Sequence, residues 1–104
     1  MSDWIEVCKL DEIPKGAGRT VRTADAVIAL FRLSDDSVRA VENRCPHKGG
    51  PLAEGIVSGR DVLCPLHNQR IHLDTGEVAP PDSGCVRTFE TRVHDGQVML
   101  RAGA

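Results

Sequence analysis

The sequence predicts an all-β fold in which strands near both ends of the chain enclose a loop-rich middle. Three observations lead to this expectation. Short stretches rich in β-forming residues alternate apolar with polar positions, Pro and Gly separate them, and almost no stretch has the period of a helix. At 104 residues the chain has the length of one domain with one modest core.

The first part of the chain is expected to form strands and one short helical turn. Residues 4–9 alternate apolar and charged side chains, as a half-buried strand does. Residues 10–14 predict a helical turn that ends at Pro14. Three further stretches share a high content of β-forming residues and are predicted strands: 19–23, 26–33 and 38–42.

Pro, Gly and polar residues dominate the middle of the chain, from residue 43 to residue 83. Turns at 58–61 and 75–76 predict two short hairpins there. Long irregular loops lose much conformational entropy on folding, so something must hold them in place. We therefore expect 43–83 to be a small subdomain inserted into the scaffold.

The β pattern resumes after the middle segment, with predicted strands at 85–93 and 97–102. Asp95-Gly96 lies between them and is a strong signal for a tight hairpin. The expected organisation is one domain over 1–104, with a scaffold of about 1–42 and 84–104.

Composition excludes several classes of function. A net charge of −2 leaves no basic surface for nucleic acid. No apolar run approaches the roughly 18–20 residues that span a bilayer, and the acidic N-terminus lacks the apolar stretch of a secretory signal. We expect a cytoplasmic protein without a membrane partner. Thiols stay reduced in that compartment, so the four cysteines indicate metal binding or packing rather than disulfides.

Two mixed pairs of metal-binding residues stand out in the middle segment. Cys45 and His47 form a C-x-H pair, and Cys64 and His67 form a C-x-x-H pair. Residues 48–63 separate the pairs, so only folding can bring them together. Each loop then supplies one sulfur and one imidazole to a common point.

Three interpretations of these pairs compete. In the first, the cysteines are small packing residues and the histidines are incidental. In the second, the four side chains bind structural zinc, although zinc sites more often pair Cys with Cys and His with His. In the third, they hold a 2Fe–2S cluster in which two histidines replace two cysteines on one iron. The mixed loops favour the third interpretation.

The stretch CPHKGGPLAEG…CPLHNQRIHLDTGEVAPP resembles the motif of the Rieske 2Fe–2S family, including the proline after each cysteine. The resemblance extends over nearly the whole chain. More narrowly, the chain resembles the small subunits of NAD(P)H-dependent nitrite reductases. That resemblance depends on His67-Asn68, on the segment PDSGCVRTFETRV and on the opening WIEVCKLDEIP.

The resemblance implies a fold, a cofactor and a partner. The fold would be an antiparallel β-sandwich scaffold that carries the cluster-binding subdomain. Cys45, His47, Cys64 and His67 would bind one Rieske-type 2Fe–2S cluster. The chain would be an electron-transfer subunit that works with a large subunit carrying flavin, sirohaem and a further iron–sulfur cluster. That large subunit would reduce nitrite to ammonium in nitrate assimilation, with electrons from NAD(P)H.

Two other functions remain open at this level. A free-standing Rieske ferredoxin that donates electrons to a ring-hydroxylating or other oxygenase would carry the same site. A zinc-stabilised interaction module is the alternative from another class. The sequence offers no nucleophile–base pair, so the chain is not expected to be catalytic alone.

Several other residues are weaker candidates for a functional role. The basic side chains near the two loops form either a solvated rim or a surface that steers an acidic partner: Arg44, Lys48, Arg70 and His72. Cys8 and Cys85 are expected to be reduced core or near-surface residues. His94, beside a tight turn, is expected to be exposed.

We predict a midpoint potential in the lower third of the Rieske range of about −150 to +300 mV. High-potential Rieske proteins add Ser and Tyr hydroxyls and a disulfide between the loops. This chain has no Tyr and has Asn68, Gly50 and Leu66 at the positions concerned. Redox titration followed by EPR measures the midpoint, and a value clearly above zero would contradict the prediction.

Overall fold

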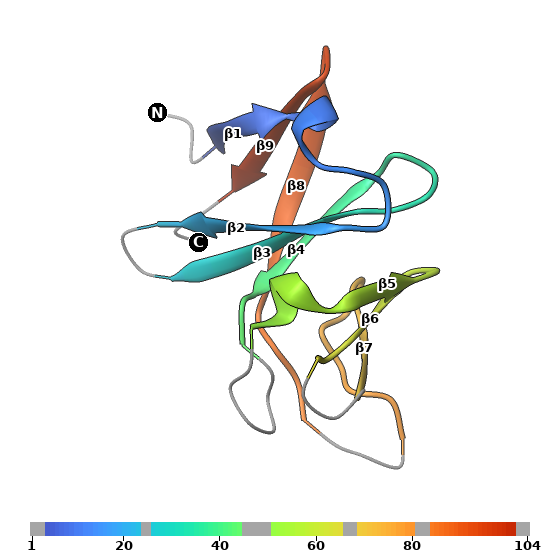
Figure 1. Ribbon diagram of the computed structural model, residues 1–104. Coiled ribbons are helices and arrows are strands. Elements are labelled where there is room, and N and C mark those ends of the chain that lie inside the picture. Colours follow the sequence, from blue (N-terminus) through green and yellow to red (C-terminus); the bar gives the residue numbers. More distant parts are fainter. Residues whose placement is uncertain (1–3, 24–25, 45–50, 66–68, 81–83, 102–104) are drawn as a thin grey trace.

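The computed structural model describes residues 4–23, 26–44, 51–65, 69–80 and 84–101 (Figure 1). Strands make up most of the ordered structure within these ranges, as the sequence predicts. The elements are β1 (Trp4–Lys9), η1 (Leu10–Glu12), β2 (Gly18–Arg22), β3 (Val27–Arg32), β4 (Val38–Glu42), η2 (Leu52–Glu54), β5 (Ile56–Ser58), β6 (Asp61–Leu63), β7 (Arg70–His72), β8 (Thr88–His94) and β9 (Gln97–Arg101). Both helices are single 3₁₀ turns, and no helix in the described ranges is long and apolar enough to cross a membrane.

The scaffold is a six-stranded antiparallel sheet with the order β1-β9-β8-β4-β3-β2. Strand β8 belongs to both halves, because Thr88 and Phe89 pair with β4 whereas Glu90–His94 pair with β9. Where β8 leaves β4, the Thr91 hydroxyl donates a 2.6 Å hydrogen bond to the Val38 carbonyl. The sheet therefore curls over itself along β8 (Figure 1).

The two halves of the curled sheet enclose a common core, as expected for the predicted β-sandwich. One half contributes Cys8, Val98 and Leu100. The other contributes side chains from β3 and β4, among them Ile28, Leu30, Val38 and Ala40. Burial of this apolar surface is the main favourable term in folding.

Strand β3 is buried on both faces. Its even positions Ile28 and Leu30 face the core inside the curled sheet. Its odd positions Ala29 and Phe31 belong to a second core, together with Val62 and other residues of the middle segment. A strand covered on both sides is apolar at successive positions, which explains why residues 27–31 lack alternation.

A second, three-stranded antiparallel sheet has the order β5-β6-β7. Its first hairpin has the predicted turn at 58–61, where Gly59 takes a positive φ of 61°. The predicted second hairpin is smaller than expected, since only the isolated bridge Ile71↔Val78 links its two arms.

The last hairpin forms as predicted, whereas β8 begins later than the sequence indicates. Asp95 and Gly96 both take positive φ, 50° and 76°, as a two-residue turn between twisted strands requires. Strand β8 begins at Thr88 rather than at Cys85. Cys85 instead makes an isolated bridge to Glu77, which holds the start of the predicted strand against the middle segment.

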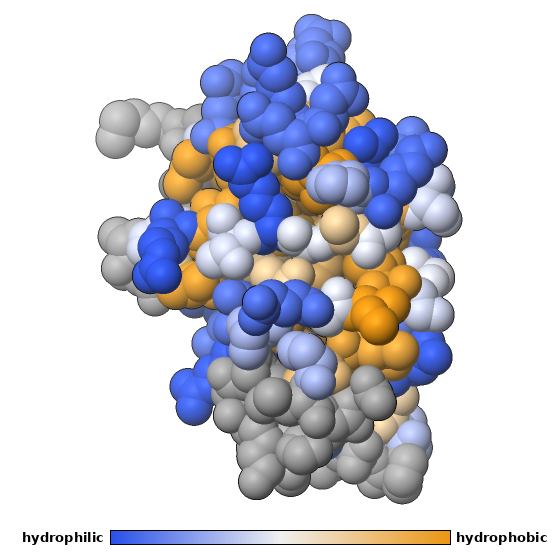
Figure 2. Space-filling view, in the orientation of Figure 1, coloured by the Kyte–Doolittle hydropathy of each residue, from blue (hydrophilic) through white to orange (hydrophobic). Residues whose placement is uncertain are grey.

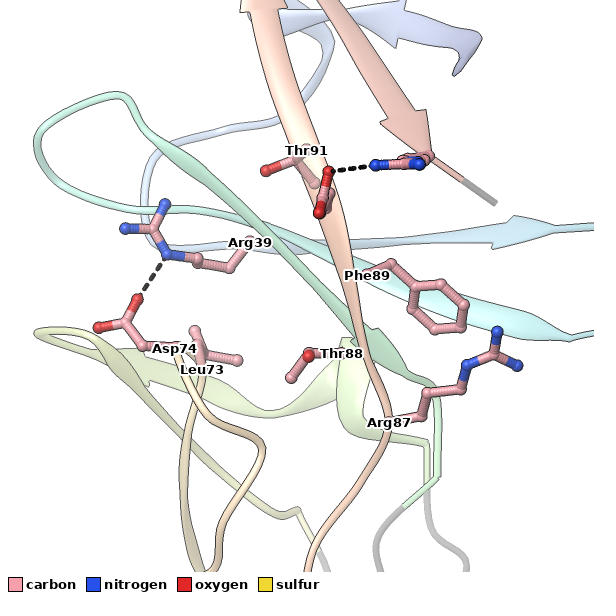
Figure 3. Close-up of a pocket in the computed structure, with 9 residues that line it drawn as sticks. Arg39, Leu73, Asp74, Arg87, Thr88, Phe89 and Thr91 are labelled. Carbon is pink, nitrogen blue, oxygen red and sulfur yellow. Dashed lines mark hydrogen bonds and ion pairs between the residues drawn. The ribbon is translucent and has the colours of Figure 1, made fainter. Parts of the chain in front are cut away.

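Asp74 connects the middle segment with the scaffold. One of its oxygens accepts a 2.7 Å hydrogen bond from Arg39 of β4, and the other accepts one of 2.7 Å from Arg60 in the β5–β6 turn. Figure 3 shows the Arg39–Asp74 pair beside β8. The hydrogen bonds from Arg60 and Arg39 lower the pKa of Asp74 from 3.8 to about 2.

We predict that this carboxylate makes stability depend on pH. A depressed pKa in the folded state means that the contribution is complete above pH 3.8 and disappears as the pH falls toward about 2. The side chain is 43% exposed, so Asp74→Asn should cost only roughly 0.5–1 kcal/mol at pH 7. Denaturant unfolding of both proteins from pH 7 to pH 3 measures the difference, which should shrink below pH 4. A difference that stays constant with pH would contradict the assignment.

Candidate metal centre

Cys64 is the one predicted ligand that lies within the described residues. It directly follows β6, and its side chain is fully buried in the second core beside Leu52 and Val62. The Cys64 amide donates a 2.8 Å hydrogen bond to the carbonyl of Gln69, which directly precedes β7. That bond closes the β6–β7 loop at its base, so the cysteine leaves the sheet at a fixed point.

Cys45, His47 and His67 lie outside the described residues, and so does Lys48. The chain on either side of the first loop is described. The Asn43 side-chain carbonyl accepts a 2.8 Å hydrogen bond from the Ala53 amide, and the Asn43 amide donates to Val27 of β3. Asn43 therefore joins the two ends of the loop that contains the C-x-H pair and ties them to the scaffold.

The bases of the two loops are packed side by side. Helix η2 follows the first loop, and Gly55 at its end lies so close to the Leu63 carbonyl that a Cβ at residue 55 would collide with it. On its other side, η2 lies against Gly18 of β2, where a Cβ would approach the Ala53 carbonyl to 2.5 Å. Leu63 directly precedes Cys64. The exit of the first loop thus touches the entry of the second.

This arrangement fits the donor set that a mixed Cys–His centre needs. The Cys64 side chain lies within the apolar core, whereas its loop leads outward to Pro65, which is exposed. Thiolate sulfur and imidazole nitrogen suit iron–sulfur clusters and also zinc. Among the described residues, no three His, Cys, Asp or Glu side chains form a group that could hold a metal ion.

A charged group borders the β6–β7 hairpin on its outer face. Asp61 of β6 pairs in register with His72 of β7, and His72 Nδ1 lies 2.7 Å from Asp61 Oδ1. Arg70 donates a 2.9 Å hydrogen bond to Asp61 Oδ2. Burial raises the pKa of Asp61, but these two partners outweigh burial and leave the pKa below its ordinary value. Arg70 and His72 were expected from the sequence among the basic side chains near the loops. Asp61 was not, because only the register of the hairpin brings it to them.

Two cysteines and one histidine in the described ranges lie outside this hairpin and its loop: Cys8, Cys85 and His94. Cys8 is buried in the scaffold core, and that burial raises its thiol pKa. Cys85 is exposed, and both cysteines are free thiols, as expected. His94 is exposed beside Asp95, also as expected.

A polar cleft of about 570 Å³ opens along β8 on the scaffold (Figure 3). The Arg87 guanidinium lies 4.7 Å from the centre of the Phe89 ring at one side of the strand. Arg39 and Asp74 form an ion pair at the other side. Arg39 pairs with Asp74 and Arg101 pairs with Glu90, so these charged groups of the cleft neutralise one another, and the structure assigns no ligand to it.

Comparison with known proteins identifies the protein family of the chain. The sequence profile of the Rieske-like 2Fe–2S domain matches residues 3–101. The chain therefore belongs to the Rieske-like 2Fe–2S domain family, whose characteristic cofactor is the cluster that the mixed pairs predict.

Two kinds of relative within the family match nearly the whole length of the chain. The chain is 33% identical over 107 residues to the nitrite reductase (NADH) small subunit of Escherichia coli, covering 97% of this chain and 99% of that one. It is 30% identical over 100 residues to the ferredoxin component of the naphthalene 1,2-dioxygenase/salicylate 5-hydroxylase systems of a Ralstonia species, covering 95% of each chain.

A solved structure confirms the fold. A Mycobacterium tuberculosis protein assigned as an NADH-dependent nitrite reductase small subunit superposes with a TM-score of 0.88. Its sequence is 33% identical, and the match covers 97% of this chain and 96% of that one. The predicted all-β fold and family are both confirmed.

We predict that Asn43 secures the first loop. Asn43→Ala removes the acceptor for the half-buried Ala53 amide, which should lower stability by about 1–2 kcal/mol and hasten loss of bound iron to a chelator. Asn43→Asp retains an oxygen in the same position and is the matched control. Visible absorbance against time with excess chelator measures iron loss. Equal rates for the alanine and aspartate variants would show that the hydrogen bond does not hold the loop.

Proposed function

We propose that this chain is an electron-transfer protein that holds one 2Fe–2S cluster through Cys45, His47, Cys64 and His67. The observation that carries the proposal is the position of Cys64, which is buried at the closed base of a hairpin loop and is followed by His67 three residues later in the sequence. The family match supports the iron–sulfur interpretation over zinc or simple packing.

When bound, such a cluster would supply reversible one-electron chemistry. The protein's own residues position it and shield it. Leu52, Val62 and Ile71 are fully buried in the same apolar cluster as Cys64, and they would keep water from the Cys64 sulfur. Backbone N–H groups near a cluster sulfur favour the more negative, reduced state, but Pro65, directly after Cys64, has no N–H to donate.

We propose the small subunit of an NAD(P)H-dependent nitrite reductase as the specific role. The 33% identity over nearly the whole of the E. coli small subunit supports it. Nitrite would then be reduced on a large partner subunit with flavin, sirohaem and a further iron–sulfur cluster, and the complex would work in the cytoplasm in nitrate assimilation. This chain would carry electrons and have no substrate site of its own.

A ferredoxin of an oxygenase system is the second candidate. The 30% identity over 95% of the Ralstonia ferredoxin component favours it. Reconstitution separates the two roles. Purified chain, reduced by dithionite, is mixed either with a nitrite reductase large subunit or with a terminal oxygenase, and cluster reoxidation is followed by stopped-flow absorbance. Rapid reoxidation by the large subunit alone supports the first role, and rapid reoxidation by the oxygenase alone supports the second.

We further propose that residues 43–83 behave as a cluster-dependent subdomain within the single domain 1–104. In the part of the chain that the structure describes, no strand of one sheet pairs with a strand of the other, and the scaffold of about 1–42 and 84–104 has its own core inside the curled sheet. Metal binding and local folding should therefore be coupled in the middle segment alone.

Cys64→Ser should abolish the visible absorbance and the EPR signal of the reduced protein. It should also increase hydrogen exchange in β5–β7 while β3, β4 and β9 stay protected, because only the loops lose their common ligand. Cys85→Ser, at an exposed free cysteine outside the proposed site, is the control and should retain the full signal. A Cys64→Ser protein that keeps its cluster would refute the ligand assignment, and global loss of protection would refute the subdomain boundary.

A further inference from the structure

The three-stranded sheet has one face against the scaffold and one face turned away from it. Val57, Val62 and Ile71 pack into the second core. Side chains alternate between faces along a strand, so the remaining positions form the outer face: Ile56, Ser58, Asp61, Leu63, Arg70 and His72. The strand register aligns them in two rows, Ile56–Leu63–Arg70 and Ser58–Asp61–His72.

The first row is unusually apolar for an exposed surface. Ile56 is 66% exposed, compared with 46% for Ile5 and 39% for Val93, the other exposed large hydrophobic residues in the described ranges. Figure 2 shows an apolar area over the position of β5. Directly opposed side chains in a sheet lie about 5 Å apart, so Ile56, half-buried Leu63 and the stem of Arg70 form one continuous strip.

The strip lies at the end of the sheet that bears the candidate cluster site. Leu63 directly precedes Cys64, and Arg70 directly follows Gln69, whose carbonyl closes the loop. A protein that covers the strip would therefore stand beside the loop of Cys64. Electron transfer becomes steeply slower with distance, so this end of the molecule is where a redox partner must approach.

Charge around the strip is largely balanced. Arg70 Nη1 and His72 Nδ1 lie 2.9 Å and 2.7 Å from the two oxygens of Asp61. The carboxylate offsets the guanidinium charge, which weakens the long-range steering expected of Arg70 and His72. Apolar contact at the strip, with one arginine at its edge, matches the composition of protein–protein interfaces.

We propose that the Ile56–Leu63–Arg70 strip is the docking surface for the redox partner protein. The partner would present an apolar patch to Ile56 and Leu63 and a carboxylate or carbonyl acceptor to Arg70. This inference rests on the proposed electron-transfer function and adds to it the surface through which the partner binds.

The test compares two exposed isoleucines. Ile56→Glu places a charge in the strip, and Ile5→Glu places the same charge on β1 of the scaffold. Iron content and midpoint potential are measured first. Stopped-flow reoxidation of the reduced chain by increasing concentrations of the nitrite reductase large subunit, or of the oxygenase if that reacts instead, then gives the apparent affinity. Ile56→Glu should weaken it at least tenfold and Ile5→Glu by less than twofold.

A neutral variant, Ile56→Gln, separates loss of apolar contact from charge repulsion and should weaken the affinity severalfold. Equal affinities in all the proteins would overturn the docking surface while leaving the function intact. A loaded wild-type chain that reduces neither partner would overturn the function instead. Analytical ultracentrifugation tests a second copy of the chain as the occupant. A wild-type dimer that becomes monomeric with Ile56→Glu would identify that second copy and would also overturn the proposal.

Discussion

The mutual anchoring of two loop bases is the constraint on which the rest of the structure depends. The Asn43–Ala53 and Cys64–Gln69 hydrogen bonds each close one loop at its base. The near contact of Gly55 with Leu63 places the two bases together. Without these contacts, the loops that contain the four proposed ligands would have to be ordered at full entropic cost whenever a cluster bound.

Strand β3 connects the scaffold to the two loop bases. Because β3 is buried on both faces, it joins the core of the curled sheet to the core beneath the loops. Phe31 on its odd face contacts the region of Gly18 and η2, so the exit of the first loop rests on the most buried strand. The Asp74 pairs with Arg39 and Arg60 add a second connection at the far end of the small sheet, where exposure makes each pair weak.

Sequence reasoning predicted most of the scaffold because its strands have local signals. The alternation in residues 4–9 and the Asp95-Gly96 turn depend only on neighbours along the chain, and both predictions are confirmed. The sequence did not predict the start of β8 or the small size of the second hairpin. Both depend on the bridge between Glu77 and Cys85, a contact that no local pattern encodes.

In the candidate site, too, some features have a local sequence signal and others do not. Motif spacing identified the four proposed ligands, whereas Asp61 and the outer strip emerge only from the register of β5, β6 and β7. Ile56 and Leu63 looked like ordinary apolar strand residues in the sequence. Ile56 is exposed and Leu63 is half-buried because Val57 and Val62, on the opposite face, pack into the core.

The central claim is that two sulfurs and two imidazoles hold a pair of irons in this chain. Mössbauer spectroscopy of anaerobically purified, ⁵⁷Fe-labelled protein tests it most directly, together with iron and acid-labile sulfide analysis. We predict about two irons and two sulfides per chain. The two iron sites should be inequivalent and present in equal amounts, one with cysteine and one with histidine as its protein ligands. Equivalent irons, or a protein that contains zinc and no sulfide, would contradict it.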